Sequence, residues 1–300
     1  MWTLAVDATT RSVVEALQGA GVPCLLFKGP SVSGWLYDDA SQRTYVDSDI
    51  LVNPARTADA AEVLTRLGFR RDFGPLPHPG MEAPPSHPWR RGRLTVDLHE
   101  TVPGATAARP TVFAELNTGA EVLEVAGGRV PVPGEHARLV LVALHAAHHG
   151  PRVPGPLNDL RAALERGSED DWSSAARCAA AIGAEGAFAE GLSLAPAGAA
   201  LLARLGIESR TSVAWLLARD GPPVAAGIER LASAAGVSAR VAVLRDELLP
   251  TAEFMRWSSP LARRSSRGLA AAYVQRWFYL LSRGPRAFAA WRQARKRLAQ

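Results

Sequence analysis

The stretch Tyr45-Val46-Asp47-Ser48-Asp49-Ile50-Leu51-Val52 places two carboxylates inside an otherwise apolar run that is typical of a β-strand. Successive strand residues face opposite sides, so Asp47 and Asp49 point the same way, about 6.5 Å apart along the strand. Two like charges side by side repel each other unless a cation lies between them. Because Mg²⁺ and Mn²⁺ take oxygen ligands from carboxylates and from substrate phosphates, the pattern predicts a metal site on one face of this strand.

A second strand is expected at Leu94-Thr95-Val96-Asp97-Leu98-His99, where one aspartate stands among alternating apolar residues. If it pairs beside the first strand at the usual spacing of about 4.8 Å, Asp97 joins Asp47 and Asp49 in one cluster. The alternative is that these aspartates cap turns or pair with surface arginines. Burying three such charges without partners is costly, which favours the metal site. His99 shares the face of Asp97 and could approach the site, although a core or interface role is favoured for it.

The segment before the first carboxylate has the pattern of a phosphate-binding turn. Val22–Phe27 reads as a short buried strand, and Lys28-Gly29-Pro30-Ser31 turns into an apolar helix-like stretch from Val32 to Tyr37. Free backbone N–H groups and the helix dipole at such a turn attract an anion. The sequence therefore predicts a phosphate-binding site at Lys28, Gly29 and Ser31.

Two basic side chains support this prediction. Only two of the 34 basic residues are lysines, Lys28 and Lys296, so a lysine in the glycine turn indicates that a compact point charge is needed there. Arg43 lies four residues before Asp47 and is expected to bind a triphosphate through two parallel hydrogen bonds.

Several pieces of the chain together resemble a known family. They are Leu-Leu-Phe-Lys-Gly-Pro at 25–30, Trp-Leu-Tyr at 35–37, Arg-Thr-Tyr-Val-Asp-Ser-Asp-Ile-Leu-Val at 43–52, Val-Asp-Leu-His at 96–99, Leu-His-Ala-Ala-His-His-Gly at 144–150 and Leu-Asn-Asp-Leu-Arg at 157–161. This combination, over roughly residues 10 to 170, resembles the bacterial uncharacterised nucleotidyltransferase family of the DNA polymerase β-like nucleotidyltransferase superfamily. The wider superfamily usually has Gly-Ser close before the Asp-x-Asp. Here the turn lies further from Asp47, which leaves the role of Ser31 open.

The resemblance implies a reaction. A nucleoside monophosphate would pass from a nucleoside triphosphate to an acceptor by in-line displacement at the α-phosphorus, with pyrophosphate leaving. Asp47, Asp49 and Asp97 would be the catalytic, metal-binding carboxylates for two Mg²⁺ ions about 3.5–4 Å apart. Asp97 would act as a metal ligand or as a base toward the acceptor. The acceptor stays open between a small molecule, a peptide or natural-product intermediate, and a protein. A catalytically silent nucleotide-binding or antitoxin-like interaction protein is the alternative.

Length and patterning predict an α+β protein. The chain has 300 residues, of which 47% are hydrophobic, enough for one large or two modest domains. We expect a small nucleotidyltransferase-like domain with a mixed sheet over residues 1–133, an α-helical domain over 134–250, and a basic, aromatic-rich helical extension over 251–300.

The expected elements follow from periodicity and turn residues. Helices are predicted near 8–19 and over Thr57–Leu67, a loop over Gly74–Pro88, and a β-hairpin over Glu121–Pro133. Further helices are predicted at 135–149, 157–166, 171–182, 185–193, 196–204, 210–218, 222–234 and 238–248.

Three histidines in the helical part share one helix face, namely His145, His148 and His149. With Asp159 they could form a metal site, but the usual helical zinc motif carries a glutamate that is absent here. We favour an acceptor-side or interdomain role, in which one histidine bonds Asp159 or a nearby carbonyl.

The remaining sequence features concern partners and location. Residues 254–300 contain 11 basic and no acidic residues, interleaved with aromatic ones, which suits an anionic partner: nucleic acid, an acidic protein or an anionic membrane surface. Packing of this segment on the rest of the chain is the simpler alternative.

The two cysteines, Cys24 and Cys178, need not pair, the N-terminus lacks signal-peptide features, and no apolar run is long enough to span a membrane. These features predict a cytoplasmic protein.

Overall fold

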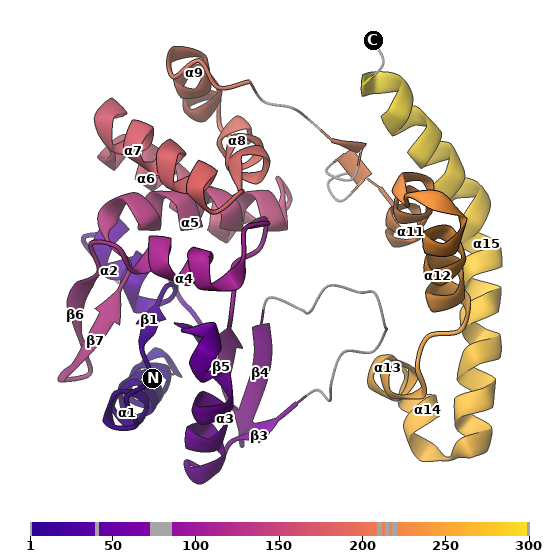
Figure 1. Cartoon of the computed structure of the whole chain (residues 1–300), viewed down its shortest axis with the longest axis horizontal. Helices are drawn as coiled ribbons and strands as arrows, with labels where there is room; N and C mark the ends of the chain where they lie inside the picture. The colour runs from indigo at the N-terminus through magenta and orange to yellow at the C-terminus, as the bar shows by residue number, and fades with distance from the viewer. Residues whose placement is uncertain are drawn as a thin grey trace. The chain divides into compact units, whose positions relative to one another are not determined.

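The computed structural model describes residues 2–39, 42–72, 86–208, 212–213, 216–217 and 221–298, with the backbone alone for Trp2, Glu253 and Trp257. The described residues form two compact units (Figure 1). We call the part through Glu208 the N-terminal unit and the part from Ser212 onward the C-terminal unit. The domain boundaries expected at residues 133 and 250 fall inside these units and stay predictions.

A mixed five-stranded sheet lies at the centre of the N-terminal unit. Its strands are β1 (Cys24–Leu26), β2 (Asp47–Val52), β3 (Arg70–Arg71), β4 (Ser86–Arg91) and β5 (Leu94–His99), in the order β1-β2-β5-β4-β3. The predicted pairing of β2 with β5 is confirmed, and it is parallel, whereas the other neighbouring strands pair antiparallel. Together with the surrounding helices this sheet confirms the predicted α+β class.

Strand β4 corrects part of the predicted loop at Gly74–Pro88. Residues 73–85 lie outside the described part of the chain, but Ser86–Pro88 open a strand that pairs along the whole of β5. Proline removes a ladder donor and reads as a loop signal in sequence. In the folded protein, pairing with β5 and the burial of Trp89 outweigh that preference.

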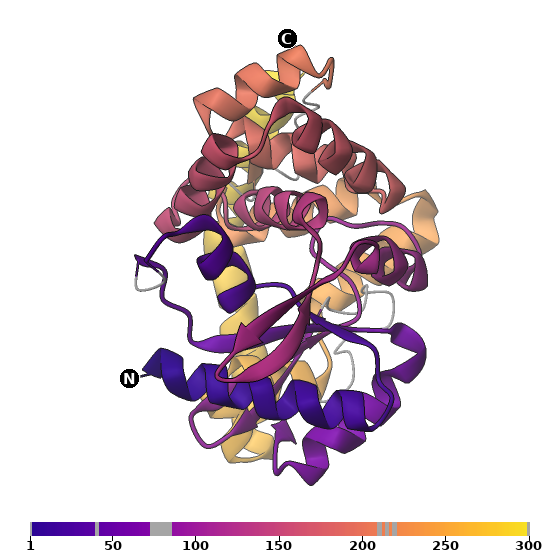
Figure 2. The same cartoon turned by 90° about the vertical axis from the view of Figure 1, so that its left-hand side faces the viewer.

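The alternation of side chains along β2 separates two hydrophobic cores. Ile50 and Val52 belong to a core with helices α1 (Trp2–Gly19) and α3 (Thr57–Arg66) and the hairpin of β6 (Glu121–Val125) and β7 (Gly128–Val132), which Figure 2 shows beside α1. Leu51, on the opposite face, belongs to a second core with helix α5 (Glu135–His149). Because Asp47 and Asp49 share the parity of Leu51, they face the α5 side of the sheet.

The helices of the N-terminal unit match most of the predicted positions. Besides α1, α3 and α5 they are α2 (Pro30–Leu36), η2 (Pro54–Arg56), α4 (Arg109–Asn117), α6 (Pro154–Arg166), α7 (Glu169–Ala181), α8 (Glu185–Ser193) and α9 (Pro196–Arg204). Ser168 and Asp171 form a capping box at the start of α7. Helix α4 was not predicted, and α1 begins six residues earlier than the predicted 8–19.

The C-terminal unit contains helices α11 (Pro223–Ser233), α12 (Gly236–Leu248), α13 (Ala252–Ser258), α14 (Pro260–Arg264) and α15 (Ser266–Leu298). Most of the helix predicted at 210–218 lies outside the described residues. Helix α15 is 33 residues long and continues through Pro285. Two small cores hold the unit together, one around Ala287 and one around Met255. None of the helices in the described ranges is long and apolar enough to cross a membrane.

Candidate active site

The sequence Asp47-Ser48-Asp49 places polar groups on both faces of β2, and each face uses them differently. Ser48 is buried toward α1, and its Oγ lies 2.6 Å from the Oγ1 of Thr10, so its hydroxyl is satisfied inside the core. Asp49 points to the other face. It lies directly opposite Asp97 in the parallel register of β2 and β5. The strand pairing thus brings two carboxylates from distant parts of the chain together.

Asp49 is buried and has two partners at the same oxygen. The Nζ of Lys28 donates to its Oδ1 over 2.7 Å, and the Nε2 of His99 lies 3.0 Å from the same atom. Burial alone raises the pKa of Asp49, but the hydrogen bond from His99 and the charge of Lys28 outweigh it and hold the pKa below its usual range. Burial also lowers the pKa of His99, so its ring is neutral and its Nε2–H donates to the carboxylate. Asp49 is therefore ionised.

Asp97 and Asp47 have the opposite electrostatics. Burial and the charges of Asp49 and Asp47 raise the pKa of Asp97 to about 6. Burial and the charge of Asp49 also raise the pKa of Asp47. The Oδ1 of Asp97 is buried and accepts no hydrogen bond from any described residue. Lys28 lowers both pKa values, as do Arg43 at Asp47 and Arg90 at Asp97, but these cations offset the effects of burial and like charge only in part.

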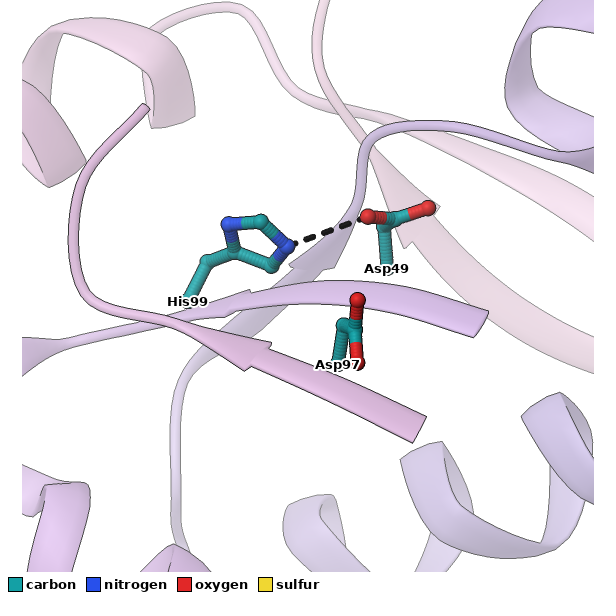
Figure 3. A group of neighbouring side chains, drawn as sticks. All are labelled: Asp49, Asp97 and His99. Atoms are coloured by element: carbon teal, nitrogen blue, oxygen red, sulfur yellow. Dashed lines mark hydrogen bonds and ion pairs between the residues drawn. The ribbon is translucent and has the colours of Figure 1, made fainter. Parts of the chain in front are cut away.

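The donor atoms at this place fit a metal ion. Asp49, Asp97 and His99 form a group whose possible ligand atoms lie within 4.8 Å of one another (Figure 3). Because the Nε2–H of His99 donates to Asp49, the two carboxylates are the candidate ligands and His99 is their outer partner. Figure 3 shows the three side chains on the same side of the sheet, with Asp97 on the strand beside Asp49. Asp47 lies outside this group, although it is on the same face of β2 and raises the pKa of Asp97. Two crowded carboxylates, one with a buried unpaired oxygen, form a donor set that suits a divalent cation.

The Lys28-Gly29 turn has the backbone that was predicted but not the free donors. Gly29 adopts a φ of 59°, which favours glycine, and a Cβ at this position would lie 3.3 Å from the ring of Tyr45. The N–H groups of Ser31, Val32 and Ser33 donate to the carbonyls of Lys28 and Gly29. These donors already close the turn, so the contacts do not support the predicted backbone phosphate seat, which stays a prediction. The Lys28 side chain is the charge that the turn directs toward the site.

Arg43 and Asp159 form an ion pair with each other. Asp159 is 2% exposed, and it accepts from the Nε of Arg43 at 2.9 Å and 2.8 Å and from the hydroxyl of Tyr37 at 2.9 Å. This cluster links the segment before β2 to α6. It corrects the expectation that a histidine bonds Asp159. The predicted contact of Arg43 with a triphosphate has no support from these contacts and stays a prediction.

The side chain of Ser31 forms a hydrogen bond within the turn. Its side chain is fully buried, and its Oγ donates to the carbonyl of Lys28 over 3.3 Å. A direct contact between this hydroxyl and a nucleotide therefore stays a prediction that the arrangement does not support.

A cavity of about 170 Å³ opens beside the carboxylates. Its lining combines Lys28, Asp49, Asp97 and His99 with the end of α5, where His145, His148 and His149 lie, and with apolar side chains such as Leu144 and Val102. The ring of His149 makes edge contacts with those of His145 and His148, at centroid distances of 4.6 Å and 5.0 Å. Burial and the charge of Lys28 lower the pKa of His145 to about 3. The imidazole of His145 that lines the cavity is therefore uncharged.

His99 is the residue of the site whose role the sequence underestimated. It was assigned mainly to the core, and it is indeed buried, but its Nε2 bonds Asp49. The sequence signal was present, because His99 lies two residues after Asp97 and therefore on the same strand face. The pairing of β2 with β5 was needed to see which carboxylate it reaches.

Known proteins provide three comparisons. No curated protein matches the chain. The solved structures that are similar include the solution structure of the antibiotic-resistance factor ANT(2'')-Ia, 16% identical over 57% of this chain and 91% of that one, with a TM-score of 0.40. A nucleotidyltransferase-like protein from Paracoccidioides brasiliensis is 14% identical over 60% of this chain and 93% of that one, with a TM-score of 0.35. Residues 3–198 match the model of the family described as "Uncharacterised nucleotidyltransferase", and the chain therefore belongs to that family.

Proposed function

We propose that the N-terminal unit transfers a nucleoside monophosphate from a nucleoside triphosphate to an acceptor, with Asp47, Asp49 and Asp97 holding Mg²⁺ or Mn²⁺. The observation that carries this proposal is the register of β2 and β5. It sets Asp49 opposite Asp97, whose buried Oδ1 accepts no hydrogen bond within the part of the chain that the structure describes. Membership of the family supports the same reaction class.

The carboxylates would bind the cation together, although Asp49 and Asp97 differ in how readily they take up a proton. When bound, a divalent cation would neutralise charge that develops on the phosphates and on the attacking oxygen. Asp49 is already ionised, because Lys28 and His99 stabilise its charge. Asp97, with a pKa raised to about 6, stands close to the point at which it gains or loses a proton near neutral pH. That value suits a group that takes a proton from the acceptor as well as one that binds a cation.

Two neighbours would position the reactants. His99 donates to Asp49 and so fixes the orientation of that carboxylate, as outer partners of metal ligands commonly do. Lys28 is partly exposed at the cavity, and its ammonium group could turn from Asp49 to a phosphate oxygen of the nucleotide. In this scheme Gly29 supplies the tight turn and Lys28 the charge.

The end of α5 would form the acceptor side. His145, His148 and His149 line the cavity across from the carboxylates. A neutral imidazole both donates and accepts hydrogen bonds, so this wall suits an uncharged hydroxyl or amine. Leu144 and Val102 make the remaining wall apolar, which excludes water from the attacking group. We therefore propose that the acceptor presents a neutral nucleophile on a small group that fits this cavity.

The test is transfer of label from nucleotides. The full chain is incubated with each α-labelled nucleoside triphosphate, Mg²⁺ or Mn²⁺, and cell extract as the source of acceptors. We expect label in a product together with pyrophosphate release, and loss of both in Asp49→Asn. Asp59→Asn, an exposed aspartate in α3, is the matched control and should retain transfer.

Two results would contradict the proposal in different ways. Nucleotide-dependent thermal stabilisation that requires the divalent cation, without transfer to any acceptor, would favour the catalytically silent nucleotide-binding protein. Absence of nucleotide binding in the wild type would show that the site itself is assigned wrongly.

A further inference from the structure

Helix α15 carries a stripe of large apolar side chains that face outward. Val274, Trp277, Phe278, Leu281 and Phe288 are 47%, 40%, 71%, 75% and 49% exposed. At about 100° per residue these positions fall within an arc of about 100° on one side of the helix. The arrangement is the reverse of an ordinary surface helix, whose outer face is polar.

The inner face of the same helix already has its partners. Ala272, Ala287 and Ala294 are buried against the rest of the C-terminal unit and lie on the side opposite the stripe. Leu269, Tyr273 and Trp291 are partly buried against the same two cores. The inner face of α15 thus packs without Val274, Phe278, Leu281 or Phe288.

A second exposed stripe adjoins the first. On α12, Val237, Val241, Leu244 and Leu248 follow a spacing of four, three and four residues and are between 39% and 77% exposed. Trp277 of α15 donates from its Nε1 to the carbonyl of Leu248 over 2.7 Å, which joins the two stripes at this point. Apolar surface of this extent marks an interaction site. We call it the α12–α15 surface.

Helix α15 also carries basic side chains without partners among the described residues, and those at Arg267, Arg292 and Lys296 lie on the same side of the helix as the stripe. Helix α15 contains eight basic residues and no acidic one. Within the described ranges, six of them make no ion pair, hydrogen bond or ring contact, namely Arg267, Arg283, Arg286, Arg292, Lys296 and Arg297. The nearby carboxylates are already engaged, Glu247 by Arg230 and Arg276 and Asp246 by Arg245. The carboxylates of α12 are therefore already paired with arginines and do not balance the six cations named above.

The chemistry of the surface selects among occupants. A second copy of α15 would bring eight further positive charges with no negative ones, which disfavours self-pairing. Nucleic acid needs cations and stacking rings at the centre of its footprint. Here the most exposed apolar side chains, Leu281 and Phe278, lie in the middle of the stripe. The unpaired cations on the same side of the helix, Arg267, Arg292 and Lys296, lie before and after it along the chain. An apolar stripe with cations at its two ends matches a helix lying in the headgroup region of an anionic bilayer.

We propose that the α12–α15 surface binds anionic lipid membranes, with the apolar stripes inserted at the level of the acyl chains and the arginines at the lipid phosphates. Long arginine side chains reach the headgroups while their stems stay in apolar surroundings. The helix would lie on the membrane, in agreement with the finding that no described helix can cross it. This inference is independent of the nucleotidyl-transfer proposal.

The test is sedimentation of the full chain with lipid vesicles. Vesicles of phosphatidylcholine alone are compared with an equimolar mixture of phosphatidylcholine and phosphatidylglycerol, at low and high salt. We expect partitioning that is at least about tenfold stronger on the anionic vesicles and that weakens with salt. Phe278→Gln combined with Leu281→Gln should reduce it about tenfold or more, because the inserted side chains are lost.

Matched variants separate insertion from simple attraction of charge. Leu4→Gln replaces a side chain that is 70% exposed in the N-terminal unit and should leave binding unchanged. Arg292→Gln combined with Lys296→Gln removes two unpaired charges and should weaken binding to anionic vesicles only. Glutamine is a good helix former, and circular dichroism verifies that each variant stays folded.

Three outcomes would overturn the proposal. One is the absence of binding to anionic vesicles. The second is binding that the Phe278 and Leu281 substitutions leave unchanged, which would mean non-specific adsorption of charge. The third is that Arg292→Gln combined with Lys296→Gln weakens binding to uncharged vesicles as much as binding to anionic ones. Binding of single-stranded DNA in place of vesicles would identify the surface as a nucleic-acid site instead.

Discussion

The two units of this chain differ in the burial and pairing of their charged side chains. In the N-terminal unit the important charges are buried and have assigned partners, Asp49 with Lys28 and His99 and Asp159 with Arg43 and Tyr37. In the C-terminal unit the cations of α15 are exposed, and most of them have no carboxylate partner. A buried charge must be balanced inside the protein, whereas an exposed row of like charges can be balanced only by something outside it. The first arrangement is a built site, and the second is the basis of the membrane-binding surface proposed for α12 and α15.

The comparison extends to two aspartates that lie side by side. Asp49 and Asp97 are opposite each other in register, yet the pKa of the first is lowered and that of the second is raised. The difference comes from their neighbours, since Lys28 and His99 both bond Asp49. Substitutions at these and other positions should therefore differ in their effects on the rate of transfer and on the free energy of unfolding.

The largest effect is expected for the carboxylate at the centre of the site. Asp49→Asn should lower the rate of nucleotidyl transfer by more than about 100-fold, since losing only an outer partner of a metal site costs about 10–100-fold. His99→Gln should fall within that smaller range, because it removes the donor that orients Asp49. Steady-state rates of both variants are the measurement. Equal losses in both would mean that His99 contacts the substrate directly.

Breaking the buried pair of Arg43 and Asp159 should affect stability next. Asp159→Ala leaves the Arg43 charge and the Tyr37 hydroxyl without their acceptor, which costs about 3–5 kcal/mol of unfolding free energy. At about 2–4 °C per kcal/mol, thermal denaturation should shift by roughly 6–20 °C. Asp59→Ala, an exposed aspartate, is the matched control and should cost at most about 1 kcal/mol.

The same pair distinguishes two roles of Arg43. If the arginine is structural, Arg43→Gln should destabilise the protein in the absence of nucleotide. A variant with unchanged thermal stability and a raised KM for the triphosphate would instead support the nucleotide-binding role predicted from the sequence.

A smaller effect of opposite sign is expected at Asp97. Its pKa is about 6 in the folded protein against an ordinary value of 3.8, so the stability it contributes is complete below pH 3.8 and is lost as the pH rises through 6. In a chelator at pH 7.5, Asp97→Asn should therefore raise the unfolding free energy, on the order of 1 kcal/mol after solvent screening. Denaturant unfolding at pH 5 and pH 7.5 is the measurement.

Metal removal provides the control for Asp97. Without chelator, saturating Mn²⁺ should stabilise the wild type by about 2.7 kcal/mol at a concentration 100-fold above Kd and should not stabilise the variant. If Asp97→Asn lowers stability in the chelator at pH 7.5, the unbalanced charge inferred for this carboxylate is wrong.

The smallest effect is expected on the outer face of α15. Phe278→Gln should change the unfolding free energy by less than about 0.5 kcal/mol, because the ring is 71% exposed. Ala287→Gln on the buried face of the same helix should cost about 1–3 kcal/mol through overpacking. Similar costs in the two variants would mean that the outer stripe is covered in the free protein.

Much of the N-terminal unit could be predicted from local sequence. The alternation in β2 and β5, the glycine turn at Gly29 and the hairpin at Gly127-Gly128 depend on neighbours within a few residues. The helices of the alanine-rich half were also predicted to within a few residues, because apolar periodicity and capping residues are local signals. That β2 and β5 pair was predicted from their aspartates, whereas the parallel direction of the pairing came only from the structure.

What local sequence missed has another cause. The first half of β4, Ser86–Pro88, was predicted as a loop, but its ladder partner β5 decides its conformation. The contact of Arg43 with Asp159 joins residues that are far apart in the sequence, so the pattern around Arg43 did not indicate it. His99 was expected to be buried and it is, but only the pairing of β2 with β5 shows that it bonds Asp49.

The sequence by itself determined which residue types stand on one face of a strand, where glycine was required and how charge is divided along the chain. These properties follow from the fixed geometry of the backbone and from counting residues. Only the tertiary structure decided which oxygen of Asp49 receives Lys28 and His99, which carboxylate remains unbalanced, and which face of α15 is outside. Such contacts join segments that are distant along the chain, and their energies depend on burial, which exists only after the chain has folded.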